Sequence, residues 1–347
     1  MAQTILEEKK KSRLMTEGSI WKSILLFSVP LILGNMLQQL YNTADSIIVG
    51  NFVGSNALAA VGSSGSPIFL LIGFSQGIAV GAGVVVSQFL GAKDREGAHT
   101  AVHTSLALSA ILGAILTVCG IAVSRALLTA MNTPAEVLED AVLYMRLYFG
   151  GVLFSVVYNM AAGILNAAGN SKRSLLYLGV ASITNIVLDL VLIAGCKMGV
   201  AGAAIATVAA QLISTVACFI YAFAKYPQLR LHREDMRITR GDIRRHVVQG
   251  VPLGLQFSVL AIGIIVMQGV VVQFDMLDGV MVSSSAQMGF GAANKLSSLT
   301  ATPMNALGTA MTSFTAQNLG AGNHDRIRRG ALQALGMMAI IAVAAVS

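Results

Sequence analysis

Charged side chains are scarce in this sequence. Only 11% of the 347 residues are Asp, Glu, Lys or Arg, whereas 55% are hydrophobic and the mean hydropathy is +0.73. A soluble domain could not bury so much apolar side chain, so the composition indicates a polytopic membrane protein. Because backbone groups in lipid must pair within their own segment, we expect the spanning segments to be helices and the fold class to be all-α.

Cysteine is also rare, with three residues at Cys119, Cys196 and Cys218. All three lie in or beside apolar segments, without metal-ligand spacing, and an odd number argues against a disulfide framework. We interpret them as small core residues and expect no cofactor. The first 22 residues lack the apolar core of a cleavable secretory signal, so we expect the first helix to direct insertion.

The net charge of +7 follows the hydrophilic stretches between apolar segments. Placing the amino terminus in the cytosol puts 19 of the 23 Lys and Arg residues on the cytosolic side, with Arg125, Arg146 and Lys197 outside and Lys295 unassigned. This positive-inside pattern predicts a multi-pass protein of the cell (inner or plasma) membrane. The richest basic block, residues 225–246, is interpreted as a connector beside anionic lipid, and no nucleic-acid partner is expected.

Apolar periodicity and length divide the chain into a cytosolic segment (1–22), a first lobe (23–224), the basic connector (225–246) and an incomplete second lobe (247–347). The expected membrane helices are 23–47, 57–88, 101–124, 140–166, 173–195, 199–224, 247–274, 284–315 and 330 onward.

An internal repeat supports this division. Val-Pro begins the first and seventh helices at residues 29–30 and 251–252, an offset of 222 residues, and Gln-x-Leu-Gly-Ala closes the second and eighth at 88–92 and 317–321, an offset of 229. Six helices per copy give both copies the same topology, which predicts a parallel repeat about an axis along the membrane normal. We therefore expect a bundle of 6+6 helices, of which about nine are present here and three lie beyond the end of this sequence.

Two carboxylates, Asp45 and Asp189, lie inside stretches otherwise apolar enough to cross a bilayer. An ionisable group at that depth is expensive and typically marks an ion or proton pathway. Bonds that merely hold helices together contribute about 0.6 kcal/mol, against a penalty of roughly 2.5 to 3.5 kcal/mol for a central Asp. The balance favours a functional role over a structural one.

Other polar residues recur near these carboxylates. Asn185 precedes Asp189 by four residues and shares its helix face, while Asn159 and Thr207 supply neutral oxygens from the fourth and sixth helices. In the first helix, a polar stripe repeats at three- and four-residue spacing and comprises Gln38, Tyr41, Asn42 and Asp45.

The chemistry of these groups suits a small cation. Carboxylate, amide and hydroxyl oxygens are hard ligands for an ion such as Na⁺. Protons are an equally reasonable ligand because burial disfavours the charged form of a carboxylate. Pro30 removes a backbone hydrogen bond within the first helix and predicts either a static kink or a moving bend.

Six motifs, taken together in order and spacing, resemble the multidrug and toxin extrusion (MATE) transporters. They are Val29-Pro30, Ala44-Asp45-Ser46 with Val49-Gly50, Gln88-Phe-Leu-Gly-Ala92, Asn166-Ala-Ala-Gly-Asn170, Asn185-Ile-Val-Leu-Asp189 and Gly199-Val-Ala-Gly-Ala-Ala-Ile-Ala-Thr207. The resemblance implies twelve helices in two six-helix lobes around a V-shaped cavity. It also implies a transporter, not an enzyme, that exports organic cations in exchange for Na⁺ or H⁺ and has no obligate protein partner evident.

The resemblance also assigns roles to residues. It implies a cation-coupling site at Asp45, Asn159, Asn185, Asp189 and Thr207, with Na⁺ as a possible ligand, a neighbouring substrate cavity lined by Gln38 and Tyr41, and a helix bend at Pro30. Another branch of the family places an essential carboxylate in the seventh helix. Residues 252–274 contain no acidic residue, so we expect coupling through the first lobe.

Two other functions compete with this interpretation. A lipid-linked oligosaccharide flippase has a related architecture, but its phosphates need basic groups in the cavity, and only Lys295 lies at a suitable depth. An intramembrane aspartyl protease would use paired aspartates to activate water. Its expected Tyr-Asp and Gly-x-Gly-Asp contexts are absent, because Ala44 and Leu188 precede the two residues.

Overall fold

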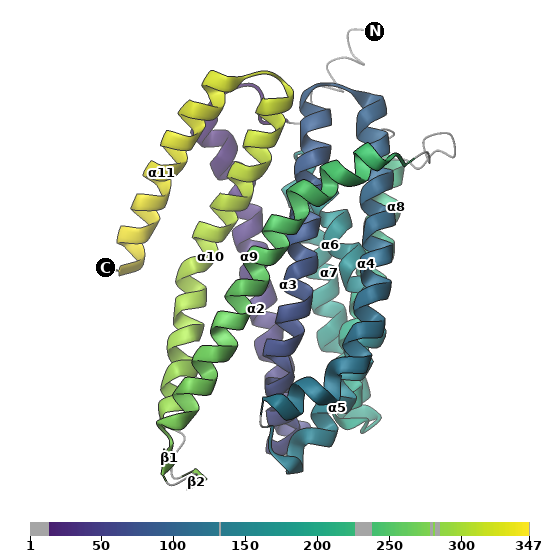
Figure 1. Ribbon diagram of the computed structural model, residues 1–347, viewed down its shortest axis with the longest axis vertical. Helices are drawn as coiled ribbons and strands as arrows, with labels where there is room; N and C mark the ends of the chain where they lie inside the picture. The colour runs from purple at the N-terminus through teal and green to yellow at the C-terminus, as the bar shows by residue number, and fades with distance from the viewer. Residues whose placement is uncertain (1–13, 132, 226–237, 278–279, 282–284, 347) are drawn as a thin grey trace.

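The protein folds as a bundle of long helices (Figure 1). The computed structural model describes residues 14–131, 133–225, 238–277, 280–281 and 285–346. Its elements are α2 (Ile20–Phe52), α3 (Ser55–Gly91), α4 (Arg95–Ala130), α5 (Ala135–Gly150), α6 (Val152–Ala167), α7 (Ser171–Asp189), the π-helix η1 (Leu190–Gly195), α8 (Gly199–Lys225), α9 (Arg240–Gln273), β1 (Met276–Leu277), β2 (Val280–Met281), α10 (Ser285–Gly320) and α11 (His324–Val346). The two short strands pair antiparallel between α9 and α10.

Several of these helices are long and apolar enough to cross a membrane. Within the described residues, α2, α3, α4, α7 with η1, α8 and α9 each meet that description, and α5 with α6 counts as a seventh span. Each segment predicted to be a membrane helix is helical in its described part, α10 and α11 included. The all-α membrane fold expected from the sequence is confirmed.

The prediction of one continuous fourth helix over residues 140–166 is wrong. The structure divides it into α5 and α6, which are bent by 50° about Gly151. A Cβ at Gly151 would overlap the side chain of Val208 on α8. The glycine therefore lets α8 pack closely against the bend between α5 and α6.

The basic connector is shorter than predicted. Residues 240–246 are the first turns of α9, which begins before the expected residue 247, while residues 226–237 lie outside the described part of the chain. Thr239 and Asp242 form reciprocal bonds at this start. The Thr239 backbone N donates to Asp242 Oδ2 at 3.0 Å, and the Asp242 backbone N donates to Thr239 Oγ1 at 3.2 Å. This capping box begins the helix earlier than apolarity alone predicts.

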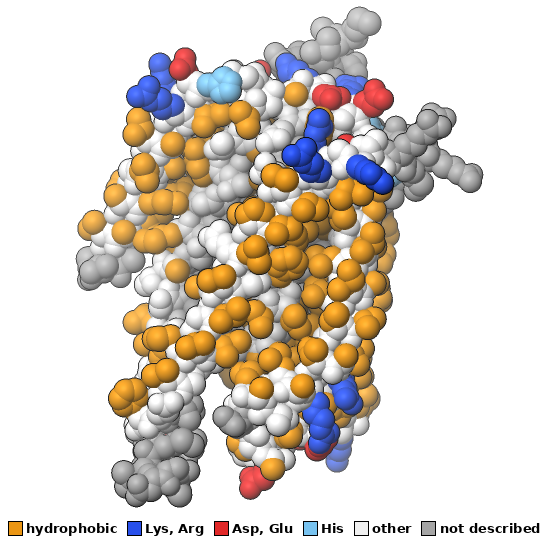
Figure 2. Space-filling model, in the orientation of Figure 1, with side chains coloured by type: hydrophobic (Ala, Val, Ile, Leu, Met, Phe, Trp, Pro, Cys, Tyr) orange, Lys and Arg blue, Asp and Glu red, His pale blue; other side chains and the backbone are white. Residues whose placement is uncertain are grey.

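Basic side chains are most numerous at one end of the bundle, here called the basic end, and a smaller group lies at the opposite end (Figure 2). The basic end comprises the start of α2, the turn from α3 to α4, the turn from α6 to α7, the start of α9 and the turn from α10 to α11. Apolar side chains cover the visible face between the two ends, as expected for a surface in contact with lipid.

The helices α9 and α10 pack against the bundle of α2–α8 through glycines near the basic end. On α3, Gly77 and Gly81 face Gly254 and Gly250 of α9 so closely that a Cβ on either α3 residue would overlap the α9 backbone. Glycine is required here because it allows two helix backbones to approach without side chains between them.

We predict that Gly81→Ala lowers the stability of the folded protein. The added methyl group has no space against the α9 backbone, and overpacking of this kind typically costs about 1–3 kcal/mol. Thermal unfolding of the detergent-solubilised variant should show a lower midpoint than the parent. Gly65→Ala on the same helix is the matched control, because an added Cβ there meets no atom within 4 Å. Equal midpoints for the two variants would contradict the assigned role of the glycine contact.

Candidate functional site

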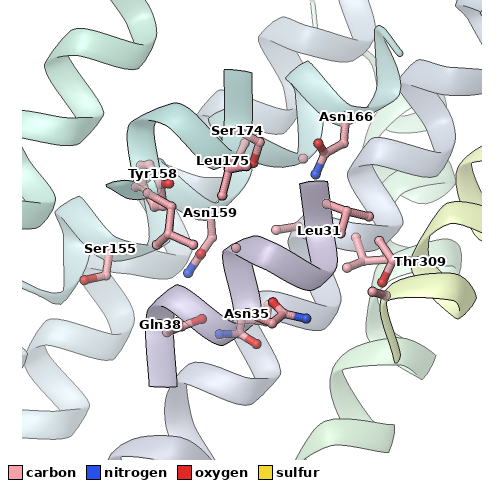
Figure 3. Close-up of a pocket in the computed structure, with 18 of the residues that line it drawn as sticks. Leu31, Asn35, Gln38, Ser155, Tyr158, Asn159, Asn166, Ser174, Leu175 and Thr309 are labelled. Carbon is pink, nitrogen blue, oxygen red and sulfur yellow. The ribbon is translucent and has the colours of Figure 1, made fainter. Parts of the chain in front are cut away.

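A cavity of about 270 Å³ lies inside the α2–α8 bundle, on the side facing α10 (Figure 3). Residues of α2, α3, α5, α6, α7 and α8 line it, and α10 contributes Ala306 and Thr309. In Figure 3 the amide side chains of Asn35 and Gln38 from α2 lie across the cavity from Asn159 of α6. Because α10 adds Ala306 and Thr309, both helix groups, α2–α8 and α9–α11, contribute to its wall.

The wall of the cavity is polar but uncharged. Of its described lining residues, none is Asp, Glu, Lys, Arg or His, and the polar ones carry amide, hydroxyl or phenol groups: Asn35, Gln38, Tyr41, Gln76, Tyr148, Ser155, Tyr158, Asn159, Asn166, Ser174, Gln211 and Thr309. Such a wall recognises a ligand by hydrogen bonds and aromatic contact. The formal charges of the site lie next to the cavity instead.

Those charges come from Asp45 on α2 and Asp189 at the end of α7. Asp45 is 9% exposed and Asp189 is fully buried, and their carboxyl groups lie within hydrogen-bonding range of each other. Asp45 Oδ1 and both oxygens of Asp189 have no donor in the structure. Two carboxylates cannot bond to each other without a shared proton or a bridging cation, so the geometry requires one of these.

Neutral oxygens extend this site. Asn185 lies one turn before Asp189, and its Nδ2 donates to Thr207 Oγ1 of α8 at 3.3 Å, while Thr207 donates to the Ala203 carbonyl at 3.0 Å. The Asn185 Oδ1 is buried without a donor. Four buried oxygens of α2 and α7 therefore lack donors. Among the described residues, no group of three or more His, Cys, Asp or Glu side chains lies together.

The helix geometry changes at Asp189. The α-helix α7 ends there and continues as the π-helix η1, whose first residue is Leu190. Single π-turns within α-helices occur frequently at functional sites. The carboxylate of Asp189 is thus held at a local distortion of the span instead of within a regular helix.

The structure divides the predicted site residues into two groups. Asp45, Asp189, Asn185 and Thr207 come together as described, whereas Asn159 lines the cavity with Gln38. Asn159 was predicted to belong to the coupling site. The structure places its side chain in the wall of the cavity, and its part in cation coupling stays a prediction.

Tyr41 connects the two groups. Its side chain lies within hydrogen-bonding range of Gln38 and interacts electrostatically with Asp45. Asn42, the remaining member of the predicted stripe, is exposed. Pro30 lines the cavity, and α2 continues through it without a break, so its role as a bend stays a prediction.

Sequence reasoning missed the tyrosines of the fourth span. Tyr144 interacts electrostatically with both Asp45 and Asp189, and its ring lies 6.3 Å from that of Tyr148, which lines the cavity. Tyr144, Tyr148, Ser155 and Tyr158 recur at intervals of four, seven and three residues, the spacing of one face in a segment taken from sequence as a continuous helix. That spacing could have identified them.

A polar cavity and an acidic pair enclosed in a multi-pass helical bundle define a membrane transporter. Comparison with known proteins specifies the class. The family profile described as MatE matches residues 30–191 and 263–347, and the chain belongs to the MATE family of transporters.

Individual relatives agree with this. The chain is 31% identical over 318 residues to the probable multidrug resistance protein YpnP of Bacillus subtilis, covering 90% of this chain and 68% of the relative. It is 31% identical over 332 residues to YoeA of the same organism, covering 94% and 70%. A solved structure described as the outward-facing conformation of a multidrug resistance MATE family transporter superposes with a TM-score of 0.87 at 28% identity, covering 96% of this chain and 72% of that one.

The acidic pair predicts cation-dependent stability. If a cation or proton occupies the pair, adding Na⁺ or acidifying the buffer should raise the unfolding temperature, because ligands that bind only the folded state stabilise it by mass action. The expected gain is about 2.7 kcal/mol at one hundred times the dissociation constant. Thermal unfolding across Na⁺ and pH series measures this.

Asp189→Asn should remove most of that dependence, since it supplies a donor and leaves a single carboxylate. The control is Glu139→Gln, which alters an exposed carboxylate paired with Arg125 at 2.6 Å. An unchanged response in Asp189→Asn would show that the pair is not the binding site.

Proposed function

We propose that this protein is a secondary active antiporter that exports organic cations and drugs in exchange for Na⁺ or H⁺. The observation that carries the proposal is the acidic pair, Asp45 and Asp189, buried together without donors beside a polar cavity. Membership of the MATE family and the multidrug resistance relatives supply the substrate class.

Exchange follows from competition between two ligands. The helix α2 carries Asp45 and also the cavity residues Asn35, Gln38 and Tyr41, so a change in its position alters both sites at once. Cation binding at the acidic pair favours one arrangement of this helix, and drug binding in the cavity favours another. Each ligand shifts the equilibrium by its differential affinity for the two states.

The direction of transport follows from the charge distribution. By the positive-inside pattern the basic end faces the cytosol, and the membrane is the cell (inner or plasma) membrane. The close glycine contacts between α3 and α9 lie toward this end, which supports a state of the transporter whose access from the cytosol is closed. A substrate in the cavity would leave by the opposite side.

The uncharged wall supports export of drugs over flipping of lipid-linked oligosaccharides. A phosphate-bearing substrate needs Arg or Lys in the wall, and the described lining residues include neither. The side chain of Lys295, the one basic candidate at membrane depth, lies outside what the structure describes. Tyrosine rings and amides, together with a nearby acidic pair, instead suit a planar organic cation.

Gradient-driven transport tests the proposal. The full-length protein in proteoliposomes should move a fluorescent organic cation such as ethidium when a Na⁺ or a pH gradient is imposed separately, and the effective gradient identifies the coupling ion. Asp45→Asn and Asp189→Asn should each reduce gradient-driven transport by more than about tenfold, because neither variant retains the two-carboxylate site.

Glu139→Gln is the control and should transport as the parent does. Ethidium binding, measured by fluorescence, should persist in both Asp variants because the cavity wall is unchanged. Gradient-driven export by both Asp variants at the parental rate would refute coupling through this pair.

A further inference from the structure

The segment that precedes α2 is docked on the other helix group at the basic end. Residues 14–19, here called the N-terminal clasp, lie against α10 and α11. The Met15 backbone N donates to Gln317 Oε1 at 2.7 Å, and Asn318 Nδ2 donates to the Met15 carbonyl at 3.1 Å. Gln317 and Asn318 are fully buried. Both bonds connect the chain entering α2 to the end of α10.

Arg326 of α11 holds the same segment. Its Nη1 donates to the Gly18 carbonyl at 2.8 Å, and its Nη2 donates to the carbonyls of Glu17 at 2.9 Å and Met15 at 3.2 Å. A guanidinium presents its donors in a fixed planar fork, so three convergent carbonyls bind it in one orientation. The clasp is therefore a formed structure and not a loose tail.

Apolar contacts reinforce this docking. The Met15 side chain is 4% exposed and belongs to a cluster that joins Ile24 and Phe27 of α2 to Leu307 and Phe314 of α10. Opening the basic end would expose these side chains, which adds a hydrophobic cost to the loss of the hydrogen bonds.

Gln317 also reaches the first bundle directly. Its Nε2 donates to the carbonyl of Ala167, the last residue of α6, at 3.0 Å. One buried side chain thus joins the clasp, α10 and α6. The terminal amide of glutamine suits this position because its oxygen accepts from the Met15 backbone while its nitrogen donates to Ala167.

The repeated motifs meet at the same place. A Cβ on Gly91 would overlap the Gln317 carbonyl, and a Cβ on Gly320 would overlap the Gln88 carbonyl. Gly91 and Gly320, like Gln88 and Gln317, occupy equivalent positions in the two Gln-x-Leu-Gly-Ala motifs. The contact is reciprocal, as a two-fold relation between repeats requires.

We propose that the N-terminal clasp, Gln317 and Arg326 form a lock that holds the basic end closed and sets the equilibrium between the two access states. These residues are positioning residues for transport, because they touch neither the cavity nor the acidic pair. All of their bonds from α10 and α11 to the clasp and to α6 must break before the cavity can open at the basic end. Weakening them shifts the population toward the open state.

Thiol reactivity measures this opening without any transport assay. Ser105 of α4 is fully buried against His246 of α9, with its Oγ 3.0 Å from the imidazole Nε2. After Cys119, Cys196 and Cys218 are replaced, Ser105→Cys places a thiol between the two helix groups at the basic end. A water-soluble maleimide applied to protein in nanodiscs reports how often the groups separate there.

Arg326→Gln and Met15→Ala should each accelerate labelling at position 105 by about tenfold, since one removes charge-assisted bonds and the other the apolar contact. Arg329→Gln, an exposed arginine of the same helix, is the matched control and should leave the rate unchanged. Arg326→Gln and Met15→Ala weaken the docking of the same segment. The double variant should therefore increase the labelling rate by no more than the product of the two single increases.

A second probe separates opening from general loosening. Ser64→Cys places the thiol in the interior of α3, where the serine is fully buried and bonds to the Ala141 carbonyl of α5 at 3.3 Å. The lock predicts no acceleration at position 64. Equal labelling at position 105 in Arg326→Gln, Met15→Ala and the parent would overturn the proposal, as would parallel acceleration at both positions. Either result would leave cation coupling at the acidic pair untouched.

Discussion

Two buried carboxyl groups that face each other without a donor are the constraint on which the rest of this structure depends. The pair of Asp45 and Asp189 is tolerated at membrane depth only when a proton or cation neutralises it. Its ligand-free form is therefore the costly form of the protein. In the proposed antiporter the ion gradient supplies the free energy, and it acts on the fold through the occupancy of this pair.

The helix α2 connects the acidic pair to the cavity and to the N-terminal clasp. It carries Asp45, one wall of the cavity and, at its start, the N-terminal clasp docked on α10 and α11. A single rigid element thus spans the proposed coupling site, the proposed substrate cavity and the closed basic end. Two sites are coupled when ligands at both of them shift the equilibrium of one structural element between two arrangements. The π-helix after Asp189 places a local distortion in α7, the helix that carries the other carboxylate of the pair.

Particular residues show how far the sequence was informative. Asp45 and Asp189 were identified because carboxylates stand out in apolar segments, and four-residue spacing placed Asn185 with Asp189. The start of α9 was misjudged because apolarity marks the lipid-spanning part of a helix, whereas the Thr239 and Asp242 capping box marks its physical beginning. The break between α5 and α6 was missed because hydropathy and length do not register a bend, and the close packing of Val208 against Gly151 involves a residue more than fifty positions away.

By itself the sequence determined that the chain is a helical membrane protein of the MATE family, because hydropathy, charge placement and motif order are properties of residues taken along the chain. Only the tertiary structure decided that Asn159 lines the cavity, that Tyr144 interacts electrostatically with the acidic pair, and that Gln317 bridges α6 and the N-terminal clasp. Helical periodicity assigns a residue to a face but does not state which helix lies opposite it. That choice belongs to the packing of elements distant in sequence.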